Sequence, residues 1–364
     1  MRRKILINHL MEPGNRITGI SNYLFYLLDE LLYGKEFEYI LLTCWNEASL
    51  PDMLKGRGMT VVTLPYIEST PRNILSQLAK VPKLAGELDC VLEFNPNPLG
   101  CFIGSVPLVS TTHDLYFNLS PHSYKFHHRI WWKVFFPLTL RRANRNISVS
   151  NNTQKDLLNF YPWTRDKSCV VQEAACLSGG VKPVERSSFG LFVANVSPNK
   201  GTDVLIQAMG ILEERGQLCD IFHIGRDSEN YIEHYGCELN LSVSPIKLGY
   251  LSDEDLRVRY SQARFLVFPS SYEGFGLPIL EAQKYGLPVI ASDIGVLREV
   301  AGKGALYFDP QNAEQLAERI YQLLNDDVLF SKLSSEAILN ERLFSWRKAA
   351  RETENVFNAA LAGH

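Results

Sequence analysis

Short apolar runs alternate along the chain with longer stretches whose apolar residues recur at helical spacing. Short apolar runs bounded by polar or turn-forming residues are typical of strands, and their alternation with helices is typical of βαβ units and parallel sheets. The pattern predicts one series of strands in each half of the chain. The strands are expected at residues 4–9, 37–43, 60–64, 90–94, 107–112 and 146–149, and then at 191–194, 220–224, 246–248, 265–268, 288–291 and 305–308.

Three stretches have the apolar spacing of helices that pack against such sheets. Helices are expected at residues 203–214 and 312–325, with a last one at about 345–360, and their apolar faces are assigned to the core. Between the two series of strands, residues 178–188 are polar and rich in glycine, proline and serine, which is typical of an interdomain linker. A chain of 364 residues exceeds the usual size of one domain, so two domains are predicted.

The densest local signal follows the expected strand at 265–268, whose four apolar residues predict burial on both faces. Gly274 and Gly276 permit positive φ and a close approach by another molecule. Pro278 suits the first turn of a helix, so a helix is expected to begin near Leu277. A strand, a glycine loop and a helix N-terminus in this order predict a binding site for a phosphate or diphosphate.

Two carboxylates, Glu273 and Glu281, stand beside this predicted anion site. A diphosphate close to both would raise the Coulomb energy unless the carboxylates bind something else. Sugar hydroxyls are candidates, because a carboxylate accepts strong hydrogen bonds from paired OH groups. The alternative is that Glu281 only complements the helix dipole and Glu273 is a solvated loop residue, and the spacing alone leaves both interpretations open.

The frame E-G-F-G-L-P-x-x-E-A, which places seven residues between Glu273 and Glu281, resembles the signature of family-4 retaining glycosyltransferases, also called group 1. The resemblance is strong over residues 190–350 and looser in the first half. The further segments that carry it are 197–201, 249–256, 288–292 and 344–346, and in the first half Gly19-Ile20, His113-Asp114 and 148–150. Bacterial mannosyltransferases of surface polysaccharide synthesis are similar.

The resemblance implies an α/β chain of the GT-B class, in which two Rossmann-like domains with parallel sheets face an interdomain cleft. Residues 1–178 would form the acceptor-binding domain and residues 188–345 the nucleotide-sugar-binding domain. Residues 346–364 would form a helix that crosses back to the first domain.

The resemblance also implies roles for individual residues. The catalytic group would consist of Glu273, His113 and Lys200, with Glu273 holding hexose hydroxyls. Glu281 would hold the ribose and Lys200 the diphosphate, while His113 and Gly19 would close the site from the first domain. The donor-binding residues are expected to be Gly19, Asn195, Lys200, Arg226, Tyr250, Gly274, Phe275, Gly276, Leu277 and Glu281.

Asn195 is a departure from the family pattern, which has an arginine at this position, five residues before Lys200. The substitution removes a positive charge from the expected diphosphate site. Arg226, in the loop after the strand expected at 220–224, is either a compensating cation or an ordinary solvated arginine.

The implied function is transfer of a hexose from a nucleotide diphosphate sugar to a saccharide or lipid-linked saccharide acceptor, with retention at the anomeric carbon. Bacterial polysaccharide or lipopolysaccharide synthesis is the expected setting. GDP-mannose is the first choice of donor, and UDP-hexoses and dTDP-rhamnose remain alternatives. The other functions left open are a sugar-nucleotide epimerase, a phosphorylase, and a non-catalytic paralogue that binds nucleotide sugar.

Composition excludes several classes of protein. A net charge of −3 does not indicate a nucleic-acid partner. The seven cysteines are scattered without a C-x-x-C pair, which argues against a disulfide framework or a zinc site. The acidic residues 253–255 follow Ser252 and are interpreted as the first turn of a capped helix, so neither a metal nor a cofactor is expected. Without a signal peptide or a spanning segment, a cytoplasmic location is expected.

Residues 122–145 contain six Lys or Arg residues, no acid, and the aromatic residues Trp131, Trp132, Phe135 and Phe136. Such a segment could lie on an anionic membrane surface, at the cytoplasmic face of the inner membrane. The alternative is a helix of the first domain, broken at Pro137, whose aromatic face packs inward. The two interpretations are compatible.

Overall fold

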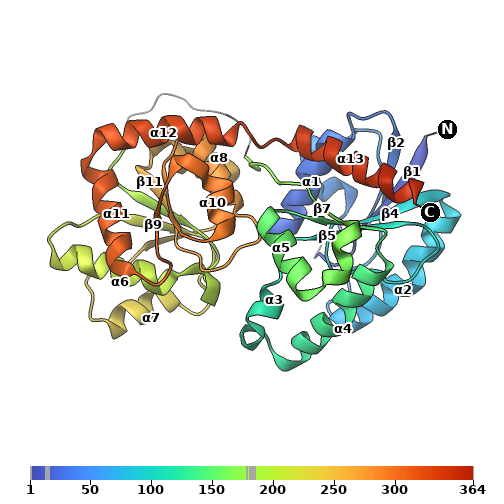
Figure 1. Ribbon diagram of the computed structural model, residues 1–364, viewed down its shortest axis with the longest axis horizontal. Coiled ribbons are helices and arrows are strands. Elements are labelled where there is room, and N and C mark those ends of the chain that lie inside the picture. Colours follow the sequence, from blue (N-terminus) through green and yellow to red (C-terminus); the bar gives the residue numbers. More distant parts are fainter. Residues whose placement is uncertain (1, 13–16, 178, 180–185, 364) are drawn as a thin grey trace. The chain divides into compact units, whose positions relative to one another are not determined.

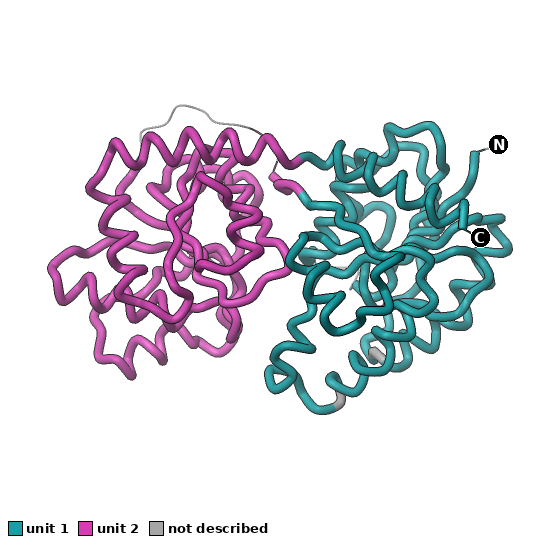
Figure 2. Tube along the Cα trace, in the orientation of Figure 1, with its two compact units in different colours: residues 1–173, 345–364 teal, residues 174–344 magenta. Residues whose placement is uncertain are grey.

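The computed structural model describes residues 2–12, 17–177, 179 and 186–363 (Figure 1). The chain divides into two compact units (Figure 2). Unit 1 comprises residues 1–173 and 345–364, and unit 2 comprises residues 174–344. The last helix of the chain therefore belongs to the same unit as the first half. Most of the expected linker, residues 178–188, lies outside the described residues.

Unit 1 contains, within the described residues, a sheet of seven parallel strands in the order β3-β2-β1-β4-β5-β6-β7. The strands are β1 Arg3–His9, β2 Phe37–Thr43, β3 Thr60–Thr63, β4 Cys90–Asn95, β5 Leu108–Thr112, β6 Arg145–Ser148 and β7 Ser168–Val170. The six predicted strands of the first half are confirmed to within a residue at each end. The seventh strand, β7, was not predicted, because it has only three half-buried residues and pairs with β6 alone at the sheet edge.

The α-helices of unit 1 include one from the far end of the chain. They are α1 Gly19–Leu31, α2 Thr70–Glu87, α3 Tyr116–Leu119, α4 Phe126–Arg142, α5 Asn151–Phe160 and α13 Trp346–Ala362. In α13, Trp346 stacks on Tyr26 of α1, and Phe357 meets the rings of Phe37 and Phe94 from the sheet. These aromatic contacts bind the last helix to the core formed by the first half.

The expected break at Pro137 is wrong, because α4 continues through this residue from Phe126 to Arg142. Proline lacks an N–H and costs a helix interior about 3 kcal/mol. On either side of it, Phe136 and Leu140 are buried completely or nearly so, at 0% and 1% exposure. Burial of such side chains stabilises by an amount of the same order, roughly 1.5–3 kcal/mol each. Packing on both sides of the proline therefore keeps the helix whole.

Unit 2 contains, over its described part, a sheet of six parallel strands in the order β10-β9-β8-β11-β12-β13. The strands are β8 Gly190–Val193, β9 Ile221–Ile224, β10 Ile246–Gly249, β11 Phe265–Phe268, β12 Val289–Ser292 and β13 Ala305–Phe308. The helices are α6 Thr202–Glu214, α7 Tyr231–Glu238, α8 Asp253–Gln262, α9 Leu277–Lys284, α10 Gly295–Ala301, α11 Ala313–Asn325 and α12 Asp327–Glu341. Every strand and helix predicted here is confirmed to within a residue or two.

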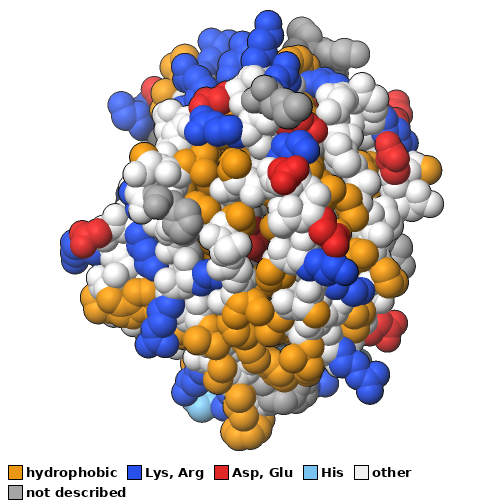
Figure 3. Space-filling model, turned by 90° about the vertical axis from the view of Figure 1, so that its right-hand side faces the viewer, with side chains coloured by type: hydrophobic (Ala, Val, Ile, Leu, Met, Phe, Trp, Pro, Cys, Tyr) orange, Lys and Arg blue, Asp and Glu red, His pale blue; other side chains and the backbone are white. Residues whose placement is uncertain are grey.

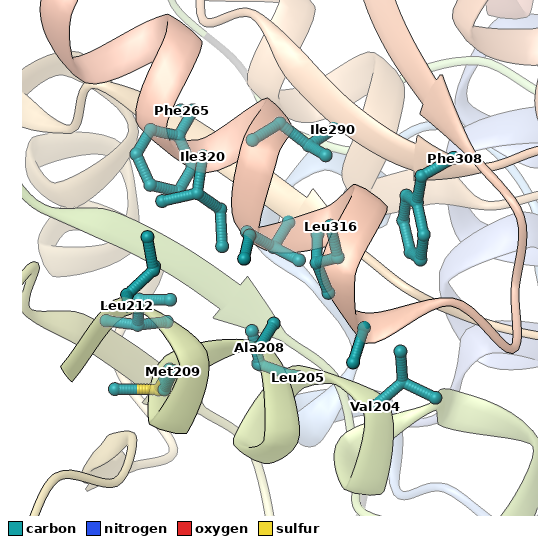
Figure 4. Close-up of a cluster of buried hydrophobic side chains, with 14 of the residues drawn as sticks. Val204, Leu205, Ala208, Met209, Leu212, Phe265, Ile290, Phe308, Leu316 and Ile320 are labelled. Carbon is teal, nitrogen blue, oxygen red and sulfur yellow. The ribbon is translucent and has the colours of Figure 1, made fainter. Parts of the chain in front are cut away.

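A large apolar cluster forms where α6 and α11 cover one face of this sheet (Figure 4). Leu205 and Ala208 of α6 lie opposite Leu316 and Ile320 of α11, and all four are fully buried. All four residues of β11 are at most 2% exposed, so its predicted burial on both faces is confirmed. This core holds the carboxyl ends of the strands in fixed positions.

Candidate functional site

The strand order of unit 2 reverses between β8 and β11, and predicted site residues follow both strands. β8 leads through α6 to β9 on one side, and β11 leads through α9 to β12 on the other. Ligands of open parallel sheets bind outside the carboxyl ends of the strands at such a reversal. The two segments concerned are residues 194–201, here named the lysine loop, and residues 269–276, here named the glutamate loop.

Hydrogen bonds tie the lysine loop to the glutamate loop. The side chain of Asn199 donates from Nδ2 to the carbonyl of Tyr272 at 3.0 Å. The carbonyl of Asn199 accepts from the backbone N–H of Ser271 at 2.9 Å. The two loops therefore hold each other in place, although they are far apart in the sequence.

A glycine brings the backbones of the two loops close together. Gly201 has φ of +63°, and a Cβ atom at this residue would stand 2.0 Å from the carbonyl oxygen of Pro269. Only glycine has both the conformational freedom and the lack of a side chain that this approach requires. Gly201 directly follows Lys200, so the close approach also sets the position of the lysine.

Lys200 and Glu273 form an ion pair between the two loops. Lys200 Nζ donates to Glu273 Oε1 at 2.6 Å, and the side chains are 22% and 12% exposed. The sequence predicts both residues for the donor site but not their direct contact. An ammonium has three donors and a carboxylate about four acceptor sites, so each group keeps capacity for a ligand.

The helix predicted to begin near Leu277 does begin there, with Gly276 as its N-cap at φ of +109°. Gly274, the other glycine of this loop, does not adopt a positive φ. Phe275 is 4% exposed, and its ring meets Phe344 edge-on. Its side chain therefore anchors the loop, and any contribution to ligand binding comes from the backbone. The first amides of a helix have no intrahelical partner, so the α9 N-terminus suits an anion.

Glu281 lies one turn further along α9 and is 8% exposed. Its Oε2 accepts a hydrogen bond from the hydroxyl of Tyr260 at 3.1 Å. Burial raises the pKa of Glu281 to about 7, aided by the charge of Asp253, while the Tyr260 hydroxyl and the backbone N–H of Cys176 oppose the rise. Glu281 therefore changes protonation near neutral pH, and its protonated form can donate as well as accept hydrogen bonds.

Asn195, Arg226 and Tyr250 come together at the ends of β8, β9 and β10. The Oδ1 atom of Asn195 accepts from the backbone N–H of Arg226 and from the hydroxyl of Tyr250, each at 2.9 Å. All three residues are exposed. Asn195, which replaces the arginine of the family pattern, thus holds the backbone of Arg226, the candidate for a compensating cation.

His113 and Gly19 belong to unit 1. His113 follows β5, and its Nδ1 lies 3.2 Å from Glu173 Oε1, while its Nε2 lies 2.8 Å from the carbonyl oxygen of Pro96. Gly19 begins α1, which Thr18 caps by accepting from the N–H of Ser21. No described atom lies within 4 Å of a Cβ atom built at Gly19, so the surrounding protein does not itself require a glycine there.

Several polar residues near these positions were not predicted from the sequence. Where the strand order of unit 1 reverses, between β1 and β4, buried Glu12 accepts from Thr18 at 2.5 Å and from Asn97 at 3.2 Å. Glu173 and Tyr260 were missed because each touches a predicted residue far away in the chain. Glu12 and Asn97 meet because they follow β1 and β4, which pair in the sheet. Strand order is not visible in the sequence, so this contact could not be predicted.

The acidic residues 253–255 form the first turn of α8. Ser252 caps this helix by accepting from the backbone N–H of Asp255, so the predicted helix cap is confirmed. Within the part of the chain that the structure describes, no group of three or more His, Cys, Asp or Glu side chains is arranged to hold a metal ion.

Comparison with known proteins identifies the family. Residues 181–342 match the family model of glycosyl transferases group 1, and residues 17–174 match that of glycosyltransferase family 4. An uncharacterized glycosyltransferase of Methanocaldococcus jannaschii is 31% identical over 359 residues, which cover 95% of this chain and 93% of that protein. O-antigen chain mannosyltransferase B of Escherichia coli is 28% identical over 265 residues, which cover 68% of this chain and 69% of that protein.

The fold is similar to that of HepE from Anabaena, solved in complex with UDP-glucose. The TM-score is 0.74 at 19% identity, with 98% of this chain and 99% of that chain covered. At this identity the likeness concerns the fold alone. Two parallel sheets, the two family models and the 31% identical relative agree, and the chain therefore belongs to the family-4, group 1 glycosyltransferases and has the GT-B fold.

Proposed function

We propose that this glycosyltransferase moves a hexose from a nucleotide diphosphate sugar to a hydroxyl of a saccharide or lipid-linked saccharide, with retention at the anomeric carbon. The observation that carries the proposal is the ion pair of Lys200 and Glu273 where the strand order of unit 2 reverses. It places a cation for phosphate beside a carboxylate for hydroxyls, next to the N-terminus of α9. A nucleotide diphosphate sugar has both kinds of group.

The predicted site residues on the two loops and on α9 each have a role in this proposal. Glu273 accepts hydrogen bonds from hexose hydroxyls, and Glu281 binds the ribose. Lys200 and the amides of Gly276 and Leu277 bind the diphosphate and stabilise the charge that develops on it as the glycosidic bond breaks. Because Lys200 is already held by Glu273, it would not have to be reoriented during the reaction.

Residues outside the two loops complete the proposed donor site. Tyr250 and Arg226 contact the nucleotide. Asn195 holds both residues in place through its hydrogen bonds to the Tyr250 hydroxyl and the Arg226 backbone N–H. His113 and Gly19 face the donor from unit 1. The positive charge at the diphosphate comes from Lys200 and the helix amides, so we propose that the transfer proceeds without a metal ion.

The donor we propose is GDP-mannose. It is supported by the similarity to an O-antigen chain mannosyltransferase, and the same similarity supports a role in bacterial polysaccharide or lipopolysaccharide synthesis. UDP-glucose is the competing donor, because HepE was solved in complex with it. The two donors differ in both base and hexose, so a direct comparison of donors is needed.

Thermal unfolding with a panel of nucleotide diphosphate sugars tests the donor. A ligand at one hundred times its Kd stabilises the folded state by about 2.7 kcal/mol, which gives a measurable rise in Tm. GDP-mannose should raise the Tm of the wild-type protein, and Lys200→Met should abolish the rise. A rise with UDP-glucose but not with GDP-mannose would replace the proposed donor.

Analysis of products tests the reaction itself. Incubation of the donor with saccharide acceptors should give an α-configured product from an α-configured donor. Conversion of the donor without an acceptor into another nucleotide sugar would indicate an epimerase, and formation of a sugar phosphate in phosphate buffer would indicate a phosphorylase. Binding without turnover would indicate a non-catalytic paralogue.

Contact with a membrane is the further part of this proposal, and α4 is the element that supports it. One side of this helix packs inward, where Trp132 stacks on Phe117 at 4.4 Å between ring centroids. Another side exposes Phe126, Ile130 and Val134, whose side chains follow one another at intervals of one helical turn. Their exposed fractions are 74%, 47% and 45%. Figure 3 shows hydrophobic side chains gathered on the lower part of the face in view, with Lys and Arg side chains at the border.

A basic ridge runs beside this exposed apolar ridge. Lys125, Arg129 and Lys133 each precede one of its residues, and the helix has no acidic residue. Apolar and basic ridges side by side suit the surface of an anionic bilayer, where a lipid-linked acceptor would be found. None of the helices that the structure describes is long and apolar enough to cross a membrane. We therefore propose a peripheral contact at the cytoplasmic face of the inner membrane.

Flotation with anionic vesicles at low salt tests this contact. Wild-type protein should float with the vesicles, and Phe126→Ser with Ile130→Ser should reduce the floating fraction several-fold. Leu339→Ser is the matched control, because Leu339 is 57% exposed on α12 of unit 2. Equal flotation of all three proteins, or none by the wild type, would remove α4 from the proposal.

A further inference from the structure

Both ring nitrogens of His113 face hydrogen-bond acceptors. Nε2 lies 2.8 Å from the carbonyl oxygen of Pro96, and a carbonyl can only accept, so Nε2 carries a proton. Nδ1 lies 3.2 Å from the carboxylate of Glu173, which also accepts. A neutral imidazole has one N–H, whereas the imidazolium has two. With Glu173 accepting as a carboxylate, the imidazolium is the form of the ring that satisfies both contacts.

The surroundings of the ring favour the same protonation state. The side chains of His113 and Glu173 are 16% and 5% exposed, so water screens their attraction only weakly. The edge-on ring of Tyr23 lies 4.9 Å away, and the charge of Asp114 acts in the same direction as that of Glu173. Burial by itself would lower the pKa of His113, yet Glu173, the Pro96 carbonyl and Asp114 together raise it above its ordinary value.

We infer that Glu173 is a positioning residue that keeps His113 as an imidazolium with Nε2 fixed on the Pro96 carbonyl. The inference rests on the proposed function, in which His113 faces the sugar donor. It gives His113 the role of a fixed positive charge at the end of β5. A ring whose two nitrogens are both protonated cannot take a proton from the acceptor hydroxyl, so His113 is not the general base of the transfer.

The direction of the pH dependence follows from the raised pKa. A group with a raised pKa in the folded state keeps its proton below that pKa and loses it as the pH rises through it. The positive charge at His113 therefore persists to a higher pH than in an ordinary histidine and is lost as the pH rises through the raised pKa. Without the carboxylate of Glu173, burial would favour the neutral ring, and the charge would be lost at a lower pH.

Nitrogen-15 NMR of the histidine side chains tests this directly, with His113→Asn used to assign the signals. In the wild type, both nitrogens of His113 should keep imidazolium shifts to a higher pH than those of an ordinary histidine, with a titration midpoint above 6.5. Glu173→Gln keeps the size and the acceptor oxygen but removes the charge, so the midpoint should fall by about one pH unit or more. Asp114→Asn is the matched control, because it removes an equal neighbouring charge without removing the Glu173 hydrogen bond, and its shift should be smaller.

The wild-type titration decides the matter even if Glu173→Gln does not fold. A midpoint at or below 6.5 in the wild type overturns the inference, as does an equal shift in the two variants. Once the donor is known, the pH profile of kcat/KM adds a second measurement, since the alkaline loss of activity should move to lower pH in Glu173→Gln. The NMR titration needs no donor, so absence of transferase activity would contradict the proposed function and leave the His113 result readable.

Discussion

Lys200 Nζ lies 2.6 Å from Glu273 Oε1, although the two residues are 73 positions apart in the chain. The contact exists because β8 and β11 are neighbours in the sheet, so that the loops after them begin side by side. The attraction between the two charges offsets part of the desolvation penalty of burying each of them. A phosphate-binding cation and a hydroxyl-binding carboxylate are thereby kept together before any ligand arrives.

The first prediction concerns this ion pair. Lys200→Met and Glu273→Gln should each lower kcat/KM by about 10²–10³-fold, because each removes a group placed for the transition state. The double variant should lose much less than the product of the two single losses, because the two groups act as a unit. Steady-state kinetics of the four proteins measures this coupling.

Arg215→Met is the control for the loss of an ion pair as such. Arg215, which directly follows α6, pairs with Glu314 of α11, outside the proposed site. Its loss should change kcat/KM by less than about threefold, as expected for a pair of little energetic value. Independent, multiplicative losses for Lys200→Met and Glu273→Gln would contradict their joint action.

The second prediction concerns pH and Glu281. Burial raises its pKa from 4.5 to about 7, so the folded state favours the protonated form. Its contribution to stability is fully present below about pH 4.5 and is lost as the pH rises through about 7. Glu281→Gln should therefore remove roughly 3 kcal/mol of destabilisation at pH 8 and have little effect near pH 4.5.

Denaturant unfolding of wild type and Glu281→Gln at several pH values measures this difference. Tyr260→Phe provides a check on the cause, because the Tyr260 hydroxyl opposes the rise in the pKa of Glu281. Without this hydroxyl, the pH-dependent loss should begin at the same pH but continue to a higher pH and reach a larger total. Parallel pH profiles for wild type and Glu281→Gln would mean that Glu281 does not titrate in this range.

The third prediction separates binding from folding at Gly19. An added Cβ atom meets no described atom within 4 Å, and alanine favours a helix more than glycine does. Gly19→Ala should therefore leave the Tm unchanged or slightly higher. If the donor diphosphate approaches this residue, the donor KM should rise at least about tenfold, a cost of about 1.4 kcal/mol. An unchanged KM would remove Gly19 from the donor site.

The fourth prediction is the converse case, Gly201→Ala. Here a Cβ atom would stand 2.0 Å from the Pro269 carbonyl oxygen, at φ of +63°. The backbones must separate, so we expect a loss of stability of about 2 kcal/mol or more together with a loss of activity through displaced Lys200. Unfolding and kinetic measurements on the same variant test both. Stability equal to that of the wild type would show that the two loops are not packed as described.

The sequence was informative where local physics decides the structure. The buried run at 265–268 and the glycine and proline of the following loop placed β11 and the start of α9 correctly. It failed at Pro137, where tertiary packing outweighs a local helix breaker, and at β7, which is too short to show a pattern. Local rules describe a residue with its chain neighbours, and these two outcomes depend on distant ones.

The candidate site was predicted as a set of residues but not as a set of contacts. Lys200, Glu273 and Glu281 are recognisable from their motif, whereas their partners are fixed by strand order and loop packing. Glu173 beside His113 and Tyr260 beside Glu281 follow from no spacing rule. Burial and these partners together shift the pKa values of His113 and Glu281, so the chemistry of the site could be derived only from the folded chain.

The membership of α13 in unit 1 has a consequence for the order in which a newly made chain matures. Residues 1–173 leave the ribosome first, yet the aromatic surface that Trp346 and Phe357 cover stays open until the final helix emerges. Residues 174–344 are contiguous and can fold as soon as they are made. The half that is synthesised first is therefore the half completed last, and during translation its apolar surface is the one that chaperones would have to shield.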